Sequence, residues 1–132
     1  MADFDKTAFS VELCSFGFLY GEENGELTID SRFLPNPYYV DSLKPLSGLD
    51  RACADYVLSF PAARKTLESL KELVLTQARG FLEQGRTGIK VCIGCTGGRH
   101  RSVALVEALV KEIAAEGFSV KTSHRDIQRY PS

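Results

Sequence analysis

A thiol, glycines and cationic side chains crowd into the segment CIGCTGGRHRS, which runs from Cys92 to Ser102. Glycines let the backbone turn successive amide hydrogens inward, and the positive end of a following helix adds to that concavity. A guanidinium such as that of Arg101 can hold two oxygens of one oxyanion. The residue types and their spacing therefore predict an oxyanion-binding loop, with Cys95 as either a nucleophile or a ligand contact.

Two chemistries fit the thiol of Cys95. The spacing Cys-x-x-Gly-x-x-Arg-Ser, completed by Gly98, Arg101 and Ser102, matches the phosphate loop of cysteine-dependent phosphatases. Neighbouring cations and a helix N-terminus favour the thiolate that such an enzyme needs. A phosphatase also needs a general acid, for which the candidates are Asp30, Asp41, Asp50 and Asp126. The alternatives are a loop that binds its anion without catalysis and a tight turn without a ligand.

The same segment holds a Cys-x-x-Cys pair, Cys92 and Cys95, of the kind used in thiol redox chemistry. In redox proteins the pair opens a helix, whereas Cys92 lies inside an apolar stretch typical of a strand. We therefore interpret Cys92 as a buried structural thiol. Because the chain has no second Cys-x-x-Cys and no His-x-His, we expect no metal, and we expect no cofactor.

The elements around this segment predict how the loop is held. The apolar stretch 88–94 predicts a buried strand, 102–117 a helix that Ser102 caps at the start and a glycine closes, and 118–124 another strand. Strand, glycine loop, helix and strand form a parallel βαβ unit. The loop then lies at the carboxyl end of a strand, where open α/β sheets bind ligands.

The preceding part of the chain predicts the rest of the domain. Alternating residues at 9–18 and 27–33 indicate two neighbouring strands, and the three prolines of 35–48 indicate a long, functional loop. Residues 49–59 read as a short helix with Ser47 as a possible N-cap, and 61–84 as a longer helix that stops at Gly85. The sequence thus predicts one α/β domain over residues 1–132, with a mixed sheet.

Composition excludes several classes of function. The chain has 132 residues and a formal net charge of -1, so bulk charge does not draw it to nucleic acid or acidic lipid. Its acidic start lacks the features of a signal peptide, and no apolar run reaches about 18 residues, so we expect no membrane association. We expect a cytoplasmic protein whose four cysteines stay reduced.

Five short segments of the sequence occur together and in this order: SFGFLYG, DSRFLPNPYY, SGLD, GCTGGRHRSV and SHRDI. In this the chain resembles the C-terminal domain of the RapZ family, also called YvcJ or UPF0042 nucleotide-binding proteins, over almost its whole length. The chain contains no Gly-x-x-x-x-Gly-Lys-[Ser/Thr], so the resemblance does not extend to the P-loop half of that family. Met1 and its short polar lead favour a free-standing relative over a fragment.

The resemblance implies a binding module for a phosphorylated small molecule, plausibly an amino-sugar phosphate such as glucosamine-6-phosphate, with a regulatory or RNA-adapter role. It also implies a protein partner and a possible homo-oligomer. The ligand-binding residues that it implies are Asp30, Arg32, Asn36, Cys95, Thr96, Gly97, Gly98, His100, Arg101 and Ser102. Asp30 and Arg32 share a strand face, so they could instead pair with each other.

Two departures from the family pattern affect these expectations. Tyr38 stands where the family has a histidine, which removes a titratable cation and puts the sugar selectivity in doubt. The basic RNA-contacting end of the family is thinned here. Its remaining members are Lys121, His124, Arg125 and Arg129. Because Asp126 offsets one of these charges, we expect RNA binding weaker than in the family.

Overall fold

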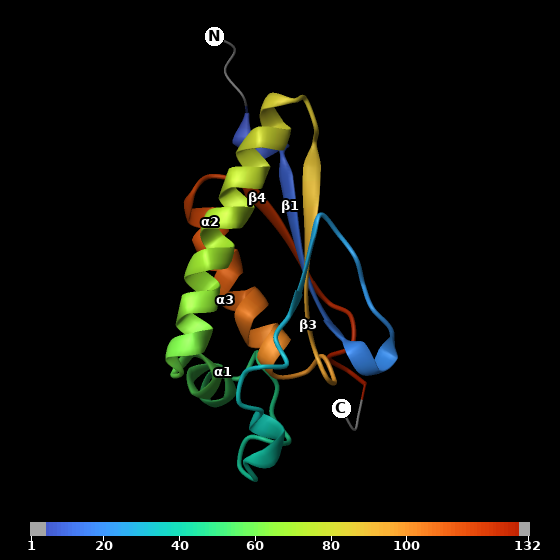
Figure 1. Ribbon diagram of the computed structural model, residues 1–132, viewed down its shortest axis with the longest axis vertical. Coiled ribbons are helices and arrows are strands. Elements are labelled where there is room, and N and C mark those ends of the chain that lie inside the picture. Colours follow the sequence, from blue (N-terminus) through green and yellow to red (C-terminus); the bar gives the residue numbers. More distant parts are fainter. Residues whose placement is uncertain (1–4, 130–132) are drawn as a thin grey trace.

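A sheet of parallel strands with helices makes up residues 5–129, the part of the chain that the computed structural model describes (Figure 1). The strands are β1 (Ser10–Gly17), β2 (Leu27–Asp30), β3 (Gly88–Cys95) and β4 (Ser119–His124). The helices are α1 (Arg51–Leu58), α2 (Pro61–Glu83) and α3 (Arg101–Ala115). Three 3-10 turns lie between them: η1 (Lys6–Ala8), η2 (Phe18–Tyr20) and η3 (Pro37–Tyr39). The predicted α/β class and the C-terminal order β3, loop, α3, β4 are confirmed.

The sheet has the strand order β2-β3-β1-β4, and every pairing in it is parallel. The sheet is therefore parallel throughout rather than mixed, and β1 and β2 are not the neighbours that we expected. The reason lies in burial. Strands buried on both faces take the centre of a parallel sheet, and here β1 and β3 are the two strands whose carboxyl halves are fully buried. The half-buried β2 and the mostly exposed β4 are left at the edges.

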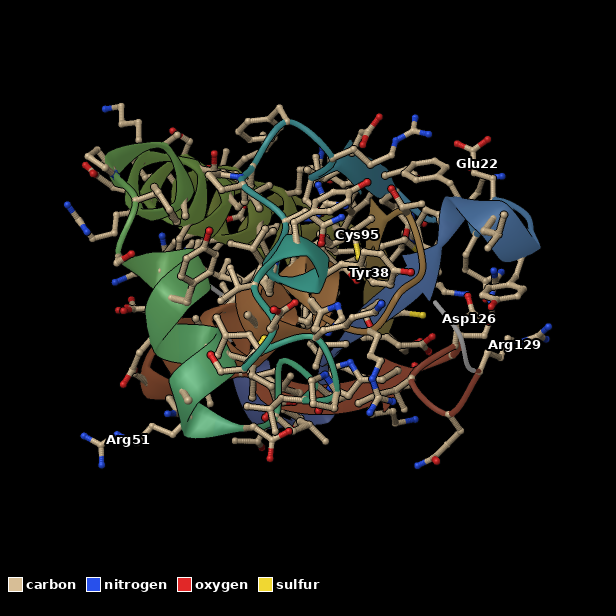
Figure 2. All side chains as sticks on the ribbon, turned by 90° about the horizontal axis from the view of Figure 1, so that it is seen from below. Glu22, Tyr38, Arg51, Cys95, Asp126 and Arg129 are labelled. Atoms are coloured by element: carbon tan, nitrogen blue, oxygen red, sulfur yellow. The ribbon has the colours of Figure 1, made fainter. Side chains whose placement is uncertain are left out.

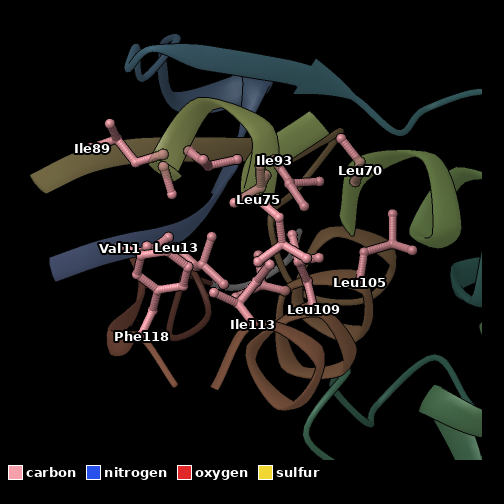
Figure 3. Close-up of a cluster of buried hydrophobic side chains, with 14 of the residues drawn as sticks. Val11, Leu13, Leu70, Leu75, Ile89, Ile93, Leu105, Leu109, Ile113 and Phe118 are labelled. Carbon is pink, nitrogen blue, oxygen red and sulfur yellow. The ribbon is translucent and has the colours of Figure 1, made fainter. Parts of the chain in front are cut away.

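One face of the sheet packs against the helices. Figure 1 shows α2 and α3 on the same side of the strands. In the close-up of Figure 3, strand residues such as Val11 and Ile93 meet helix residues such as Leu75 and Leu109. Val11 lies opposite Ile89 in the register of β1 and β3, and Ile93 is an even number of residues from Ile89, so Val11 and Ile93 share one face of the sheet. Each fully buried aliphatic side chain contributes about 1.5–3 kcal/mol to folding, so this cluster fixes the sheet against the helices.

The helix ends are partly as predicted. Helix α2 begins at Pro61, and Gly85 follows its end with a φ of 85°, in the left-handed region that favours glycine. Ser47, however, is not an N-cap, because Asp50 occupies the residue before α1. The Ser47 hydroxyl instead accepts a hydrogen bond from the amide of Leu49, within the turn that leads to the helix.

Within residues 5–129, none of the helices is both long and apolar enough to cross a membrane.

Candidate anion-binding site

The glycine loop, residues 96–100, connects the carboxyl end of β3 to the first turn of α3. It lies against the end of β1 so closely that side chains would not fit. A Cβ on Gly17 would come within 2.5 Å of the Gly97 carbonyl carbon, and a Cβ on Gly98 within 2.5 Å of the Gly17 amide nitrogen. Gly98 also has a φ of 75°. These glycines are therefore required by the contact between the loop and β1.

The backbone of this loop keeps donors available for a ligand. Within the described residues, the amides of Thr96, Gly97, Gly98 and His100 donate to no backbone acceptor, whereas the loop carbonyls of Thr96 and Arg99 accept from Leu19 and Gly48. Gly97, Gly98 and His100 are buried, whereas Thr96 is exposed. Amides at a helix N-terminus that face no backbone acceptor suit an anion, so this backbone is compatible with the oxyanion-binding loop, which stays a prediction.

Arg101, the first residue of α3, is buried beside the loop. Its Nη1 donates to the carbonyl oxygens of Arg32 and Leu34, at 2.9 and 3.0 Å. Its Nη2 donates to the Thr96 hydroxyl at 3.2 Å. The Nε atom is buried and has no hydrogen-bond partner. An unpaired buried donor costs about 1–3 kcal/mol, more when it is charged, so an oxygen acceptor at this edge of the guanidinium would be stabilising.

Cys95 and His100 complete the inner wall. The Cys95 thiol lies 3.1 Å from the hydroxyl of Ser102, which is inside α3 and does not cap it as we predicted, since His100 occupies the residue before the helix. The His100 Nε2 lies 3.1 Å from the carbonyl oxygen of Lys44. Burial lowers the pKa of His100, and the neighbouring guanidinium groups of Arg99 and Arg101 lower it further. His100 is therefore neutral near pH 7, and it donates to Lys44.

Arg99 ties the proline loop, residues 35–48, to the glycine loop. Its Nε donates to the carbonyl oxygen of Leu46 at 3.1 Å, and its Nη2 to that of Pro45 at 2.9 Å. Its Nη1 reaches the carbonyl oxygen of Ile127 at 2.8 Å, near the end of the described chain. Three peptide carbonyls thus engage this guanidinium, and its role is to hold the segments around the site together.

These segments enclose a pocket of about 210 Å³. It is lined by Asn36, Tyr38, Tyr39, Cys95, Thr96, Gly97, Arg99, His100 and Arg101. Figure 2 shows Tyr38 over Cys95, seen from the carboxyl edge of the sheet. No carboxylate belongs to the lining among residues 5–129, so the pocket is electropositive and suits an anion.

The structure brings together six of the ten predicted ligand residues at this pocket: Asn36, Cys95, Thr96, Gly97, His100 and Arg101. Gly98 and Ser102 lie behind the lining, as support for the loop. Our prediction missed Tyr39 as a lining residue and treated Tyr38 only as a departure from the family pattern. Tyr39 is 81% exposed, and in sequence nothing separates it from an ordinary surface tyrosine except its place in the proline loop.

Asp30 and Arg32 form a pair with each other, the alternative that the sequence left open. The Nε and Nη2 of Arg32 both donate to the Asp30 carboxylate, at 2.9 and 2.7 Å for the shortest contacts. This pairing lowers the pKa of Asp30 and raises that of Arg32. The Arg32 guanidinium also lies over the ring of Phe18, 4.0 Å from its centre. Neither side chain lines the pocket, which Arg32 supports through its carbonyl oxygen.

The C-terminal cluster consists of the four residues predicted to bind RNA: Lys121, His124, Arg125 and Arg129. Asp126 is buried, and its carboxylate forms ion pairs with Arg125 at 2.8 Å and with Arg129 at 3.0 Å. Its carboxylate also accepts from the Gly17 amide at 2.7 Å, behind the glycine loop. His124 lies between Ser15 and Glu107, at 2.7 and 2.8 Å. Lys121 is exposed and, within residues 5–129, is the one member of the cluster without a carboxylate partner.

The aspartates proposed as general acids are engaged elsewhere. Asp30 is paired with Arg32, and the Asp50 carboxylate accepts from the Ser47 amide at 2.8 Å. Asp126 holds the arginines of the C-terminal cluster. None of these, nor Asp41, is a lining residue of the pocket. The pocket lining therefore contains none of the aspartates that the phosphatase alternative would use as a general acid.

A parallel α/β sheet defines the class as an α/β domain, which carries a glycine loop, a buried arginine and an electropositive pocket at its carboxyl edge. A family model described as the RapZ C-terminal domain matches residues 9–128. The chain belongs to this family, which confirms the resemblance that its five sequence segments indicated.

Curated relatives agree with this assignment. Proteins named nucleotide-binding protein from Bacillus thuringiensis (strain Al Hakam), Bacillus mycoides (strain KBAB4) and Bacillus cereus (strain B4264) are each 46% identical to it over 123 residues. The match covers 92% of this chain and 42% of each relative. The chain thus spans less than half the length of the relatives that it matches.

Proposed function

We propose that this domain binds a phosphorylated small molecule of the amino-sugar phosphate class, such as glucosamine-6-phosphate, and that occupancy of the pocket regulates a partner. The observation that carries the proposal is the Nε of Arg101, which is buried beside the pocket without a hydrogen-bond partner. The side-on edge of Arg32, formed by Nε and Nη2, already holds a carboxylate in this protein. The same edge of Arg101 would hold two oxygens of a phosphate.

The pocket also offers contacts beyond the phosphate. Asn36 and the tyrosines of η3 line it opposite the glycine loop, and Tyr38 is held by a cation–π contact with Lys44 at 4.5 Å. Amide and hydroxyl groups of this kind bind the hydroxyl groups of a sugar. A volume of about 210 Å³ is below the usual range of about 300–1,000 Å³ for drug-sized ligands, which favours a small ligand.

We assign Cys95 a contact role rather than a catalytic one. Its thiol is buried and lies 3.1 Å from the Ser102 hydroxyl, and the lining provides no aspartate as a general acid. We also assign no RNA-binding role to the C-terminal cluster. Asp126 and Glu107 engage three of its four members, which reduces the charge available for phosphate backbones.

Calorimetry tests the proposal. Glucosamine-6-phosphate, glucosamine and inorganic phosphate are titrated into the wild type, Arg101→Ala and the control Arg129→Ala, while released phosphate is measured in the same samples. We expect saturable binding of the sugar phosphate without turnover, lost in Arg101→Ala and kept in Arg129→Ala. Turnover that disappears in Cys95→Ser would make the protein a phosphatase, and equal binding by Arg101→Ala would remove the proposed site.

A further inference from the structure

Cys14 and Cys92 lie directly opposite each other on the adjacent parallel strands β1 and β3. Opposed residues of neighbouring strands project to the same face, with the strands about 4.8 Å apart. That separation lies within the Cα distance of about 4.4–6.8 Å at which a disulfide forms. Both thiols are free in this structure. The backbone therefore already holds this pair at a spacing that a disulfide accepts.

The pair lies on the face of the sheet opposite α2 and α3. Together with Phe16 it forms a small buried cluster, separate from the main core and flanked by Phe18. Cys14 is 3% exposed and Cys92 is fully buried. On its other side Cys14 is opposed by Ser123 of the edge strand β4, which is exposed. Cys92 is opposed in the same way by Thr28 of the other edge strand, β2, but Thr28 is half-buried. Cys14 is thus the less deeply buried thiol of the pair.

The neighbours of Cys14 favour its thiolate. The neighbouring Cys92 thiol, the Ser123 hydroxyl and the charge of Lys90 lower the pKa of Cys14 to about 6, against the opposing effects of burial and of the Glu23 charge. The Cys14 thiol itself lies 3.4 Å from the carbonyl oxygen of Ser15. The interaction with Cys14 and desolvation raise the pKa of Cys92. The two thiols are therefore suited to different steps. Cys14 is suited to attack an oxidant, and Cys92 is suited to react afterwards with the oxidised Cys14.

We propose that Cys14 and Cys92 form a modification site at which hydrogen peroxide produces a disulfide between β1 and β3. The Cys14 sulfur attacks the peroxide O–O bond, giving a sulfenic acid and releasing one water. The Cys92 sulfur then attacks the Cys14 sulfur and displaces the second water, with its thiol proton taken up by the departing hydroxide. Two thiols and one peroxide thus give one disulfide and two waters.

The other two cysteines differ from this pair. Cys53 lies buried in α1, where burial raises its pKa to about 11. Cys95 lies beside the Ser102 hydroxyl in the anion pocket, and opposite the glycine Gly17 on β1. The modification site does not rest on ligand binding by the glycine loop, so either proposal can fail without the other.

Peptide mapping tests the site directly. The protein is treated with hydrogen peroxide under native conditions, blocked with N-ethylmaleimide in denaturant and digested with trypsin without reduction. We expect the peptide of residues 7–32 to be joined to that of residues 91–99, with fragmentation placing the bond on Cys92 rather than Cys95. The bond should be absent from Cys14→Ser and Cys92→Ser and present in Cys53→Ser. A bond that persists in Cys92→Ser, or four thiols all still reactive in the oxidised wild type, would overturn the proposal.

A pH profile provides a readout that does not depend on a variant folding. The rate of disulfide formation in the wild type should rise with pH through about 6 and change little above about pH 7, because most of Cys14 is then thiolate. An ordinary thiol, with a pKa near 8.5, would instead gain more than tenfold in rate between about pH 7 and 9. A rate that keeps rising to pH 9 would contradict Cys14 as the attacking thiol.

Discussion

Two groups of basic side chains lie near the carboxyl edge of the sheet, and their donors are engaged in different ways. In the C-terminal cluster, the carboxylate of Asp126 holds Arg125 and Arg129, and Glu107 holds His124. Around the glycine loop, carbonyl oxygens hold Arg99 and part of Arg101, and one edge of Arg101 has an unpaired Nε. We infer from this contrast that an unpaired donor, rather than the number of cations, marks the proposed anion site.

The largest effect should come from Arg101→Lys. A lysine keeps the charge but loses the planar fork, and it cannot replace the bonds to Arg32 and Leu34 together with two ligand oxygens. We expect the affinity for glucosamine-6-phosphate to fall about 100-fold, since truncating a buried charged contact costs about 2–5 kcal/mol. Calorimetry measures this loss. Arg129→Lys, its matched control in the C-terminal cluster, should bind as the wild type does, and a similar loss in both variants would erase the contrast.

Asp126→Asn should produce the next largest effect, on folding rather than on binding. The substitution keeps the shape of the side chain but removes the charge that holds two arginines and accepts from the Gly17 amide. We expect the free energy of unfolding in urea to fall by about 2–3 kcal/mol. Arg129→Gln, which removes only an exposed partner, should cost less than about 1 kcal/mol. An equal cost for both would show that Asp126 does not organise this cluster.

Acid should destabilise the protein through His100. Because burial lowers its pKa in the folded state, the unfolded chain binds the proton more readily. The stability associated with neutral His100 is complete above the unfolded pKa of about 6.5 and declines as the pH falls below it. Urea unfolding at several pH values between about 5 and 8 should show this decline. His100→Gln should flatten it, and an unchanged decline in that variant would point to another group.

The smallest effect is expected from charge reversal at Arg125 and Arg129. Since Asp126 already pairs with both side chains, they contribute little to binding a phosphate backbone. A contact with RNA phosphate changes the salt dependence of binding by a slope of about 1 per residue. We expect Arg125→Glu and Arg129→Glu to leave the salt slope of RNA binding within about half of that value. A larger change in the salt slope would support RNA binding by Arg125 and Arg129.

Local patterns predicted the elements of this fold better than their arrangement. The glycine loop, the apolar stretch of β3 and the glycine stops at Gly85 and Gly117 each fix local structure, so their places were predictable. The insertion of β3 between β1 and β2 depends on which strands bury both faces, and that is a property of the whole sheet. Pairing order is therefore where the sequence prediction failed.

The site residues also divide into those that a local pattern predicts and those that depend on the tertiary structure. Residues within the loop segment, such as Cys95 and Arg101, were predictable because one local motif holds them. Asp30 and Arg32 come only a few residues before Asn36, which lines the pocket. They form an ion pair with each other, however, and neither side chain lines the pocket. The use of Arg99 to hold three carbonyl oxygens depends on where the proline loop and Ile127 come to lie, which no local pattern encodes.

The most direct test of the central claim observes the Nε–H group of Arg101 while ligand is added. In a ¹⁵N-labelled protein, the arginine Nε–H resonances are assigned by comparison with Arg101→Lys and Arg129→Lys, and glucosamine-6-phosphate is titrated in. We predict that the Arg101 resonance moves downfield and exchanges more slowly with water, whereas those of Arg125 and Arg129 stay in place. An Arg101 resonance that does not respond, while those of the C-terminal cluster shift, would contradict the account.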